Sequence, residues 1–308
     1  MLTSREAILI KVESSYGVDA NPTAANDAVL VEEPSWSHEG LRLIERPAIR
    51  PSIAMLQQVY AGSLRAVSFT QEIKGSGVLG VPGEISACLR GCGLEEIINA
   101  DTSVVYKPRN ENHESVTIYY HHQNKLNVLT GALGTVSFAV EVGGVTKATY
   151  NFIGHSSPQI DAPIPNPQYD AIVPPPNVDA GFSVGGFPAV IANLSLDLGN
   201  QLSTPPDLNS EDGFGNVFIV SRDVNGSFDP QDTNVAEVDW EGNFRNNATM
   251  PLTTGVIGSD VGNRFQLDLP NIAYRSMGPG DRDGVRTLDM SFGAHEDANG
   301  DDFILTMT

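Results

Sequence analysis

The segment 115–154, SVTIYYHHQNKLNVLTGALGTVSFAVEVGGVTKATYNFIG, constrains the fold of this chain more than any other stretch. Apolar and polar residues alternate along it, as Val136, Phe138 and Val140 do with the residues between them. Turn or break signals interrupt the alternation at three places: 123–125, 130–131 and 143–144. Strict period-two alternation is typical of antiparallel strands that pack on one face only. We therefore expect a meander of four strands whose other face meets water or a partner.

The remainder of the chain also favours strands. The expected strands outside the meander are 6–14, 28–37, 63–75, 104–107, 188–199, 216–228, 249–257, 264–274, 285–294 and 303–308. Pro34 favours a bulge or a sheet edge within the second of these. Two short helices are expected: 82–93, which begins with Pro82, and 232–244, with Asp232 or Thr233 as its cap. The sequence thus predicts a mainly β protein in which a short helix lies against a sheet.

Proline divides the chain into two parts. Eight of the 20 prolines lie between Pro158 and Pro188, which is typical of an extended, semi-stiff connector. On each side the expected order is strand, loop, long strand, short helix and meander, although the second part lacks a clear match for the first strand. We therefore expect two tandem β domains, 1–157 and 188–308, joined by a connector at 158–187.

Acidic residues dominate the chain of 308 residues, with 38 Asp and Glu against 18 Lys and Arg, a net charge of −20. Most of the excess lies after residue 154, where no lysine occurs. Such a surface repels phosphate and disfavours binding of duplex nucleic acid through a basic face. A generic acidic surface that only keeps the protein soluble is the alternative interpretation.

The sequence gives little support to catalysis or to cofactor and metal binding. It has no phosphate loop, dinucleotide fingerprint or nucleophile elbow. Cys88 and Cys92 suit one face of a helix and are expected to be packed, reduced thiols. His121 and His122 are adjacent, so in a strand they would point to opposite faces and could not share one ion. The acidic run at 297–302 departs from the calcium-loop pattern and is expected to form a turn. We therefore expect no enzyme, cofactor or metal site.

Several stretches in a fixed order carry a resemblance to a known family. They are 5–17 (REAILIKVESSYG), 42–50, 69–77 leading to 82–93, 119–131, 132–154, 193–200 (NLSLDLGN) and 220–228. Together they resemble the major tail tube proteins of long-tailed bacteriophages with non-contractile tails. The segment 232–244, which contains Gly242, and the chain after Gly278 depart from the family pattern.

The resemblance implies two packed β-sheets, flanked by a short helix, in subunits that form rings. Rings stack into a hollow tail tube, through which phage DNA passes without specific binding. Some members of the family form hexameric rings, whereas those with two tandem domains form trimeric rings of pseudo-sixfold symmetry; the expected duplication places this chain with the second kind. The tape measure protein and the tail terminator and distal tail proteins are the implied partners. The implied location is the virion tail, assembled in the host cytoplasm, with no membrane contact, and we expect an acidic lumen.

Two loops, 38–62 and 200–215, are the expected contacts between rings. The first is the one locally basic patch, and Arg42, Glu45, Arg46 and Arg50 are its candidate interface residues. The alternative is that these arginines are merely solvated on a mobile loop. A receptor- or carbohydrate-binding decoration or baseplate protein is the second functional hypothesis, and a hydrolase is the third. Trp36 and Trp240 lie far apart in sequence, which disfavours an aromatic binding groove.

Overall fold

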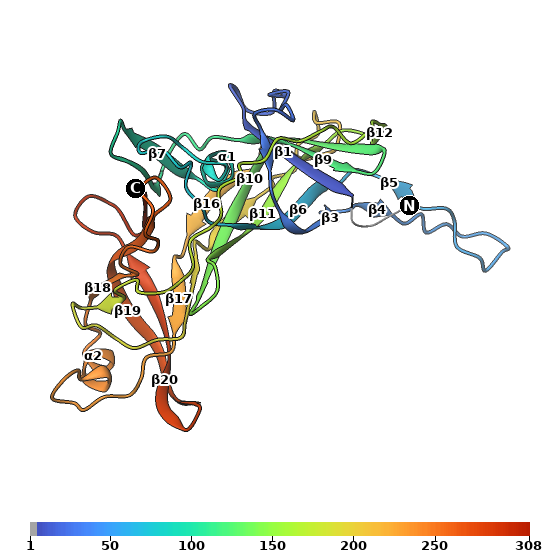
Figure 1. Cartoon of the computed structure of the whole chain (residues 1–308). Helices are drawn as coiled ribbons and strands as arrows, with labels where there is room; N and C mark the ends of the chain where they lie inside the picture. The colour runs from blue at the N-terminus through green and yellow to red at the C-terminus, as the bar shows by residue number, and fades with distance from the viewer. Residues whose placement is uncertain (1–4) are drawn as a thin grey trace.

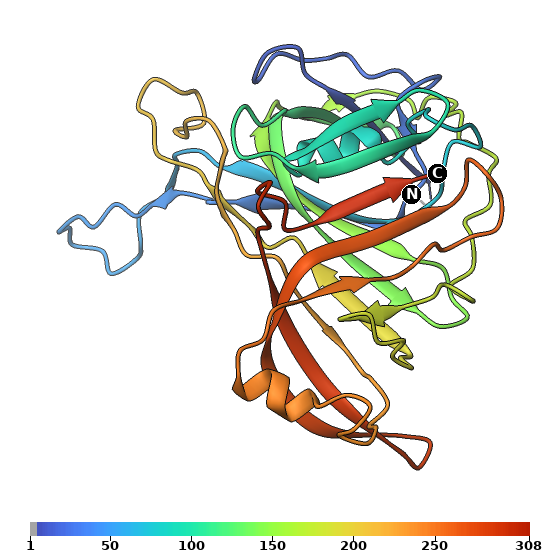
Figure 2. The ribbon, with the colours of Figure 1, turned by 90° about the vertical axis from the view of Figure 1, so that its left-hand side faces the viewer.

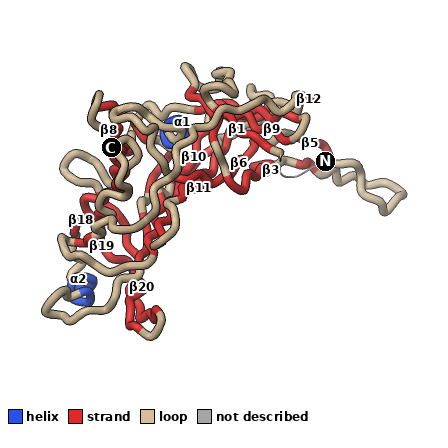
Figure 3. The backbone as a smooth tube through the Cα atoms, viewed as in Figure 1, coloured by secondary structure: helices blue, strands red, loops and turns tan. Residues whose placement is uncertain are grey.

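The computed structural model describes residues 5–308, so residues 1–4 of the predicted first domain lie outside it. The chain is mainly β, as predicted (Figures 1 and 3). The first half contains β1 (Glu6–Val12), β2 (Ala28–Val29), β3 (Glu32–Glu39), β4 (Leu43–Ile44), β5 (Val59–Tyr60), β6 (Leu64–Glu72), α1 (Ser86–Gly91), β7 (Leu94–Asn99), β8 (Ser103–Pro108), β9 (Val116–His122), β10 (Lys125–Glu141), β11 (Lys147–Ser156) and β12 (Ile160–Asp161).

The second half contains β13 (Ser183–Val184), β14 (Asn193–Asp197), β15 (Asn200–Ser203), β16 (Phe218–Arg222), β17 (Asn225–Phe228), α2 (Trp240–Arg245), β18 (Met250–Thr253), β19 (Phe265–Arg282), β20 (Val285–His295) and β21 (Ile304–Met307). Within residues 5–308, neither helix has the length or apolar character that a membrane span requires.

One antiparallel sheet runs through both halves. Its strand order is β3-β6-β11-β10-β14-β17-β20-β19, and we call it the wall sheet. It bends between the halves, so that the molecule is L-shaped in Figure 1 and open on one side. The pairings among the described residues never return to their starting strand, so the wall sheet is open. Strand β3 and the second half of β19 form its two ends.

A second layer covers one face of the wall sheet and encloses the core. It contains β2-β1-β9 against the first half of β10, and β7-β8-β21 and β13-β18 on either side of the first half of β19. Aromatic rings fill the space between the layers, among them the stacked pair Tyr150 and Phe152 and the cluster of Phe228, Trp240 and Phe292. The apolar side chains of the expected meander therefore face a core, as their alternation predicted.

The meander has three strands, not the predicted four. The expected break at 130–131 is a register shift inside the single strand β10, between Thr130 and Leu133. Gly131 has a φ of +60° there, which is costly for residues that carry a Cβ. The bulge bends β10 so that its first half pairs with β9 and its second half with β14. A similar shift between Tyr274 and Ser276 bends β19.

Strand β9 corrects a second expectation, because both of its faces are covered in part. Thr117 and His121, on the face expected to meet water, are buried. The loop after β1 lies over Thr117, which donates to Glu13 at 2.8 Å and accepts from the Ala20 amide at 3.0 Å. The Glu13 carboxylate also accepts from the hydroxyl of Ser115 and the amide of Gly131. Such long-range polar contacts leave no periodic signal in the sequence.

Both helices are shorter than predicted, with six residues each. The larger error concerns the second: its cap is Asp239, not Asp232 or Thr233, and Asp239 accepts from the amide of Gly242 at 2.8 Å. Gly242 lies inside this helix, where its lack of a side chain leaves room for that carboxylate. Strand β7, which pairs with β8 along its whole length, was missed.

The pairing pattern of the first half recurs in the second in the same chain order. Six strand pairs of the first half have a counterpart in the second. They are β1–β9 with β13–β18, β3–β6 with β14–β17, β4–β5 with β15–β16, β6–β11 with β17–β20, β9–β10 with β18–β19, and β10–β11 with β19–β20. In each half a helix follows the fifth strand of this pattern, β6 or β17. The match for the first strand is β13, two residues long, inside the predicted connector.

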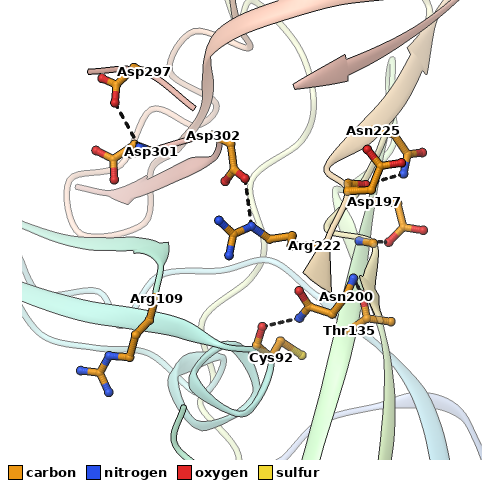
Figure 4. Close-up of polar contacts among 12 residues, drawn as sticks. Cys92, Arg109, Thr135, Asp197, Asn200, Arg222, Asn225, Asp297, Asp301 and Asp302 are labelled. Atoms are coloured by element: carbon orange, nitrogen blue, oxygen red, sulfur yellow. Dashed lines mark hydrogen bonds and ion pairs between the residues drawn. The ribbon is translucent and has the colours of Figure 1, made fainter. Parts of the chain in front are cut away.

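The two halves share strand pairs and a polar junction. Strand β10 pairs with β14, and β8 pairs with the C-terminal β21. In Figure 4 the Asn200 side chain points toward Cys92 and β10. It donates to the carbonyl oxygens of Cys92 at 2.6 Å and Gly134 at 3.0 Å, and Arg222 pairs with Asp302 at 2.9 Å nearby. The predicted domain division at 157 and 188 stays a prediction.

Candidate assembly surfaces

The uncovered face of the wall sheet is lined by small polar side chains. Strand registers place its residues in rows that cross the halves. One row contains Thr70, Thr149, Ser137, Asp197 and Asn225, and the next contains Glu72, Lys147, Ala139, Ser195, Ser227, Ser291 and Ser276. Two shallow hollows open on this face, one mainly over the first half and one mainly over the second. We call this surface the polar face.

Hydroxyl groups on the polar face pair with one another across neighbouring strands. Thr70 and Thr149 are 2.9 Å apart at their Oγ1 atoms, and the Oγ atoms of Ser195 and Ser227 are also 2.9 Å apart. The Oγ atoms of Ser276 and Ser291 are 2.5 Å apart. Such cross-strand pairs stabilise a sheet. They also occupy groups that could otherwise bind a molecule passing over the surface.

The charge of the polar face is negative. Five carboxylates lie on it without an ion pair to any described residue: Glu39, Glu72, Glu141, Asp197 and Asp289. The cations that reach it are each neutralised: Lys147 pairs with Glu32 at 2.6 Å, Arg275 with Asp223 at 2.9 Å and Arg282 with Asp229 at 3.5 Å. Phosphate groups would therefore meet unpaired carboxylates and no unpaired cation of the described rows.

A long excursion between β4 and β5 projects from the body as a separate arm in Figures 1 and 2. We call residues 45–58 the arm; they contain no helix or strand. Ile49 and Ile53 are fully exposed, and Met55 is largely so. The guanidinium of Arg50 donates to the Ala54 carbonyl and so closes the tip. Exposed apolar side chains of this kind typically mark an interaction site.

The base of the arm is fastened to the loop between β15 and β16. The guanidinium carbon of Arg42 lies 3.9 Å from the ring centre of Phe214, and its Nη1 donates to the Gly213 carbonyl at 2.9 Å. His155, at the end of β11, bonds Asp212 of the same loop at 2.7 Å. Burial raises the pKa of Asp212, but hydrogen bonds from Ser210, His155 and the Phe214 amide outweigh it, and the pKa lies below its usual value.

The structure thus brings together the two loops, 38–62 and 200–215, that the sequence suggested for contacts between rings. The side chain of Arg42 makes its contacts within the chain, with Gly213 and Phe214. Glu45, Arg46 and Arg50 are exposed on the arm and make no ion pair with described residues. The role of all four in ring stacking stays a prediction. Sequence reasoning missed Phe214, Gly213 and Asp212, because contacts across about 170 residues leave no local pattern.

The other motifs have places in the fold. Cys88 and Cys92 are buried in the core, and burial raises the pKa of both thiols. The acidic run at 297–302 forms a turn in which Asp297 accepts from the amide of Asn299 and from that of Asp301; Figure 4 shows the second contact. Among residues 5–308 no group of three or more His, Cys, Asp or Glu is arranged to hold a metal ion.

A comparison of this sequence with known protein families identifies the family to which the chain belongs. A family model described as phage tail tube protein matches residues 3–294, nearly the whole chain. No curated protein matches the chain. The match gives no support to a receptor-binding or decoration role, and a structural family of this kind favours a non-enzymatic protein. The mainly β fold is consistent with this family. This chain therefore belongs to the family of phage tail tube proteins, structural components of the virion tail that self-assemble into a tube.

Proposed function

We propose that three copies of this chain form one ring of the tail tube, with the polar face turned to the lumen. The observation that carries the proposal is the repeated pairing pattern, in which each half contributes four strands to the wall sheet. Three chains would then supply six similar units, which fits trimeric rings better than the alternative hexameric rings. The same repeat supports a tandem duplication of one β domain.

The junction inside the chain suggests how neighbouring chains join. Strand β14, which corresponds to β3, pairs with Ser137–Glu141 of β10, which corresponds to β19. Strand β3 and the second half of β19 have no partner on their outer sides among the described residues. We infer that β3 of one copy pairs with β19 of the next. Such pairing closes a barrel and removes edges that would otherwise recruit other strands.

The polar face supports passage of DNA without specific binding. Its unpaired carboxylates repel phosphates at distances up to about 8–10 Å in physiological salt. Its hydroxyls are paired with one another, and its cations are neutralised by acids. A duplex moving through such a lumen meets few groups that could hold it, as rapid genome delivery into the host requires.

The remaining partners follow from the place of a tube within a tail. We propose that the tape measure protein occupies the lumen during assembly in the host cytoplasm, and that tail terminator and distal tail proteins contact the two ends of the tube. The arm and the loop that carries Phe214 are the surfaces we assign to stacking between rings, with Glu45, Arg46 and Arg50 on the arm.

Two measurements test the proposal. Electron microscopy of the purified chain should show rings or tubes, and the mass of isolated rings should be about 99 kDa for three copies of a 32.9-kDa chain. A ring of about twice that mass would show that six copies form the ring, and the trimeric ring would then be wrong. A chain that stays monomeric at high concentration would contradict tube formation itself.

A further inference from the structure

The arm has a counterpart at the opposite end of the same strands. Strand β6 starts just after the arm, and its register with β11 places Arg65 beside Gly154 and Glu72 beside Lys147. The arm therefore leaves from the Gly154 end of β11. The β10–β11 turn, residues 142–146, lies at the other end. Figure 2 shows the arm projecting from one side of the body.

An apolar hollow of about 210 Å³ lies beside the β10–β11 turn. We call it the socket. It is formed by Val140 and Val142 at the end of β10, by residues 177–182 of the predicted connector, by residues 189–194, and by Thr254 and Ile257. Its apolar lining includes Val140, Val142, Val178, Ala180, Phe182, Ala189, Val190 and Ile191. Val142, Val178 and Val190 are exposed at its rim, so this chain alone does not bury the patch.

Charges around the arm and the socket are complementary. Asp179 lines the socket and is exposed. Arg46 and Arg50 flank Ile49 on the arm and are also exposed. The salt bridges of residues 5–308 include none of these three. A segment in which cations flank an apolar side chain would thus meet an apolar hollow with an anion in its lining.

The reach of the arm is sufficient for such a contact. It has 14 residues between β4 and β5, which pair with each other and hold its two ends together. A doubled segment of that length extends at most about 23 Å from its base. Because arm and socket lie at opposite ends of the strands, the arm of one copy would face the socket of another only if the copies are stacked head to tail.

We propose that the arm of each chain inserts Ile49 and Ile53 into the socket of a second copy in the next ring, with Arg46 and Arg50 near Asp179. This inference rests on the proposed tube and specifies the surface that each ring offers to its neighbour. Burial of two exposed isoleucines and of the socket rim stabilises stacking. The ion pairs at the edge favour the head-to-tail orientation over its reverse.

Paired cysteines test the contact in assembled tubes. Ile53→Cys combined with Val178→Cys should form disulfides between copies, because a disulfide requires the two Cα atoms to lie within about 7 Å. Each chain carries one arm and one socket, so oxidation should give a ladder of cross-linked chains in a denaturing gel without reductant. The native Cys88 and Cys92 are buried and should not compete.

The matched control is Ile53→Cys combined with Ile98→Cys. Ile98 is 53% exposed and Val178 is 52% exposed, but Ile98 lies on β7, outside the socket. This pair should give no ladder. An equal ladder from the control, or from Ile53→Cys alone, would overturn the proposal and place the arm elsewhere. If the wild-type chain forms tubes but Ile53→Cys with Val178→Cys gives no ladder, the contact between arm and socket is contradicted and the proposed tube is not.

A second variant tests the same contact in case the double cysteine variant does not form tubes. Ile49→Ser combined with Ile53→Ser should give rings of unchanged mass and a loss of tubes, since both side chains are fully exposed and contribute nothing to the fold of one chain. Ile98→Ser is the control and should assemble normally. Normal tubes from the double serine variant would contradict insertion of the arm. Absence of tubes from the wild-type chain would instead contradict the proposed function.

Discussion

The guanidinium of Arg42 lies over the aromatic ring of Phe214, 3.9 Å from its centre, although 171 residues separate Arg42 from the neighbouring Gly213, to which it also donates. The pair fastens the base of the arm to the loop between β15 and β16. Backbone hydrogen bonds join Arg42 to Ala61 and Gly62, which follow β5 where the excursion returns to the body. The arm thus projects from an anchored base, which limits the directions in which it can point.

Phe214→Leu should loosen this base. A cation–π contact of this kind contributes about 0.5–2 kcal/mol, and leucine keeps much of the apolar volume without the ring. Amide exchange at Ala61, whose N–H donates to the Arg42 carbonyl, should become faster in hydrogen-exchange mass spectrometry. Phe218→Leu, at an exposed position on β16, is the control and should leave that exchange unchanged. Equal exchange in both variants would show that Phe214 does not hold the base.

Arg46→Glu combined with Arg50→Glu should give rings that do not polymerise. Both side chains are exposed on the arm, so reversal of their charge should leave the free energy of unfolding within about 0.5 kcal/mol. Arg42 is left intact because its contacts lie within the chain. Electron microscopy and the mass of the assemblies distinguish rings from tubes. Arg245→Glu, at an exposed position of helix α2, is the control; tubes of normal length from the arm variant would refute the charged contact.

Local patterns predicted much of this fold. Alternation found the strands of the meander, and Pro34 correctly marked a bulge, since the β3–β6 register shifts between Glu32 and Ser35. The failures share one physical cause. The continuity of β10 through Gly131, the burial of Thr117 and the contact of Arg42 with Phe214 depend on segments distant in sequence. The arm was found because basic residues and prolines are local features, whereas the socket combines four separate segments.

Asn200→Ala should destabilise the junction between the halves. The buried amide of Asn200 donates to the carbonyl oxygens of Cys92 and Gly134, and alanine would leave both without this donor. Loss of a buried hydrogen-bond partner costs about 1–3 kcal/mol. Urea unfolding should show the midpoint at a lower concentration with a similar slope. Asn193→Ala, on an exposed position of β14, should have little effect, and equal midpoints for the two variants would contradict the junction.

Asp212 should make the stability of the arm base depend on pH. Its pKa is below the usual value in the folded chain, so its carboxylate stabilises the fold above the pKa of the unfolded chain, about 3.9. That contribution is lost as the pH falls through the lower folded pKa. Asp212→Asn should therefore be less stable at pH 7, and the difference from wild type should shrink below about pH 4. A difference that stays constant from pH 7 to pH 3 in denaturant unfolding would contradict this role.

Lysines on the polar face should slow the passage of DNA without preventing tube assembly. Ser68 and Ser195 lie on this face in different halves, and neither is buried, so lysine should be accommodated at both. Each ring would then carry unpaired cations that attract phosphates, and the attraction should weaken as salt increases. In virions assembled with Ser68→Lys and Ser195→Lys, genome release should be slower than in wild type and should recover at high salt. Ser68→Asn with Ser195→Asn controls for volume, and Ser259→Lys, on an exposed loop, controls for added charge. Release at the wild-type rate at every salt concentration would show that the polar face does not line the channel.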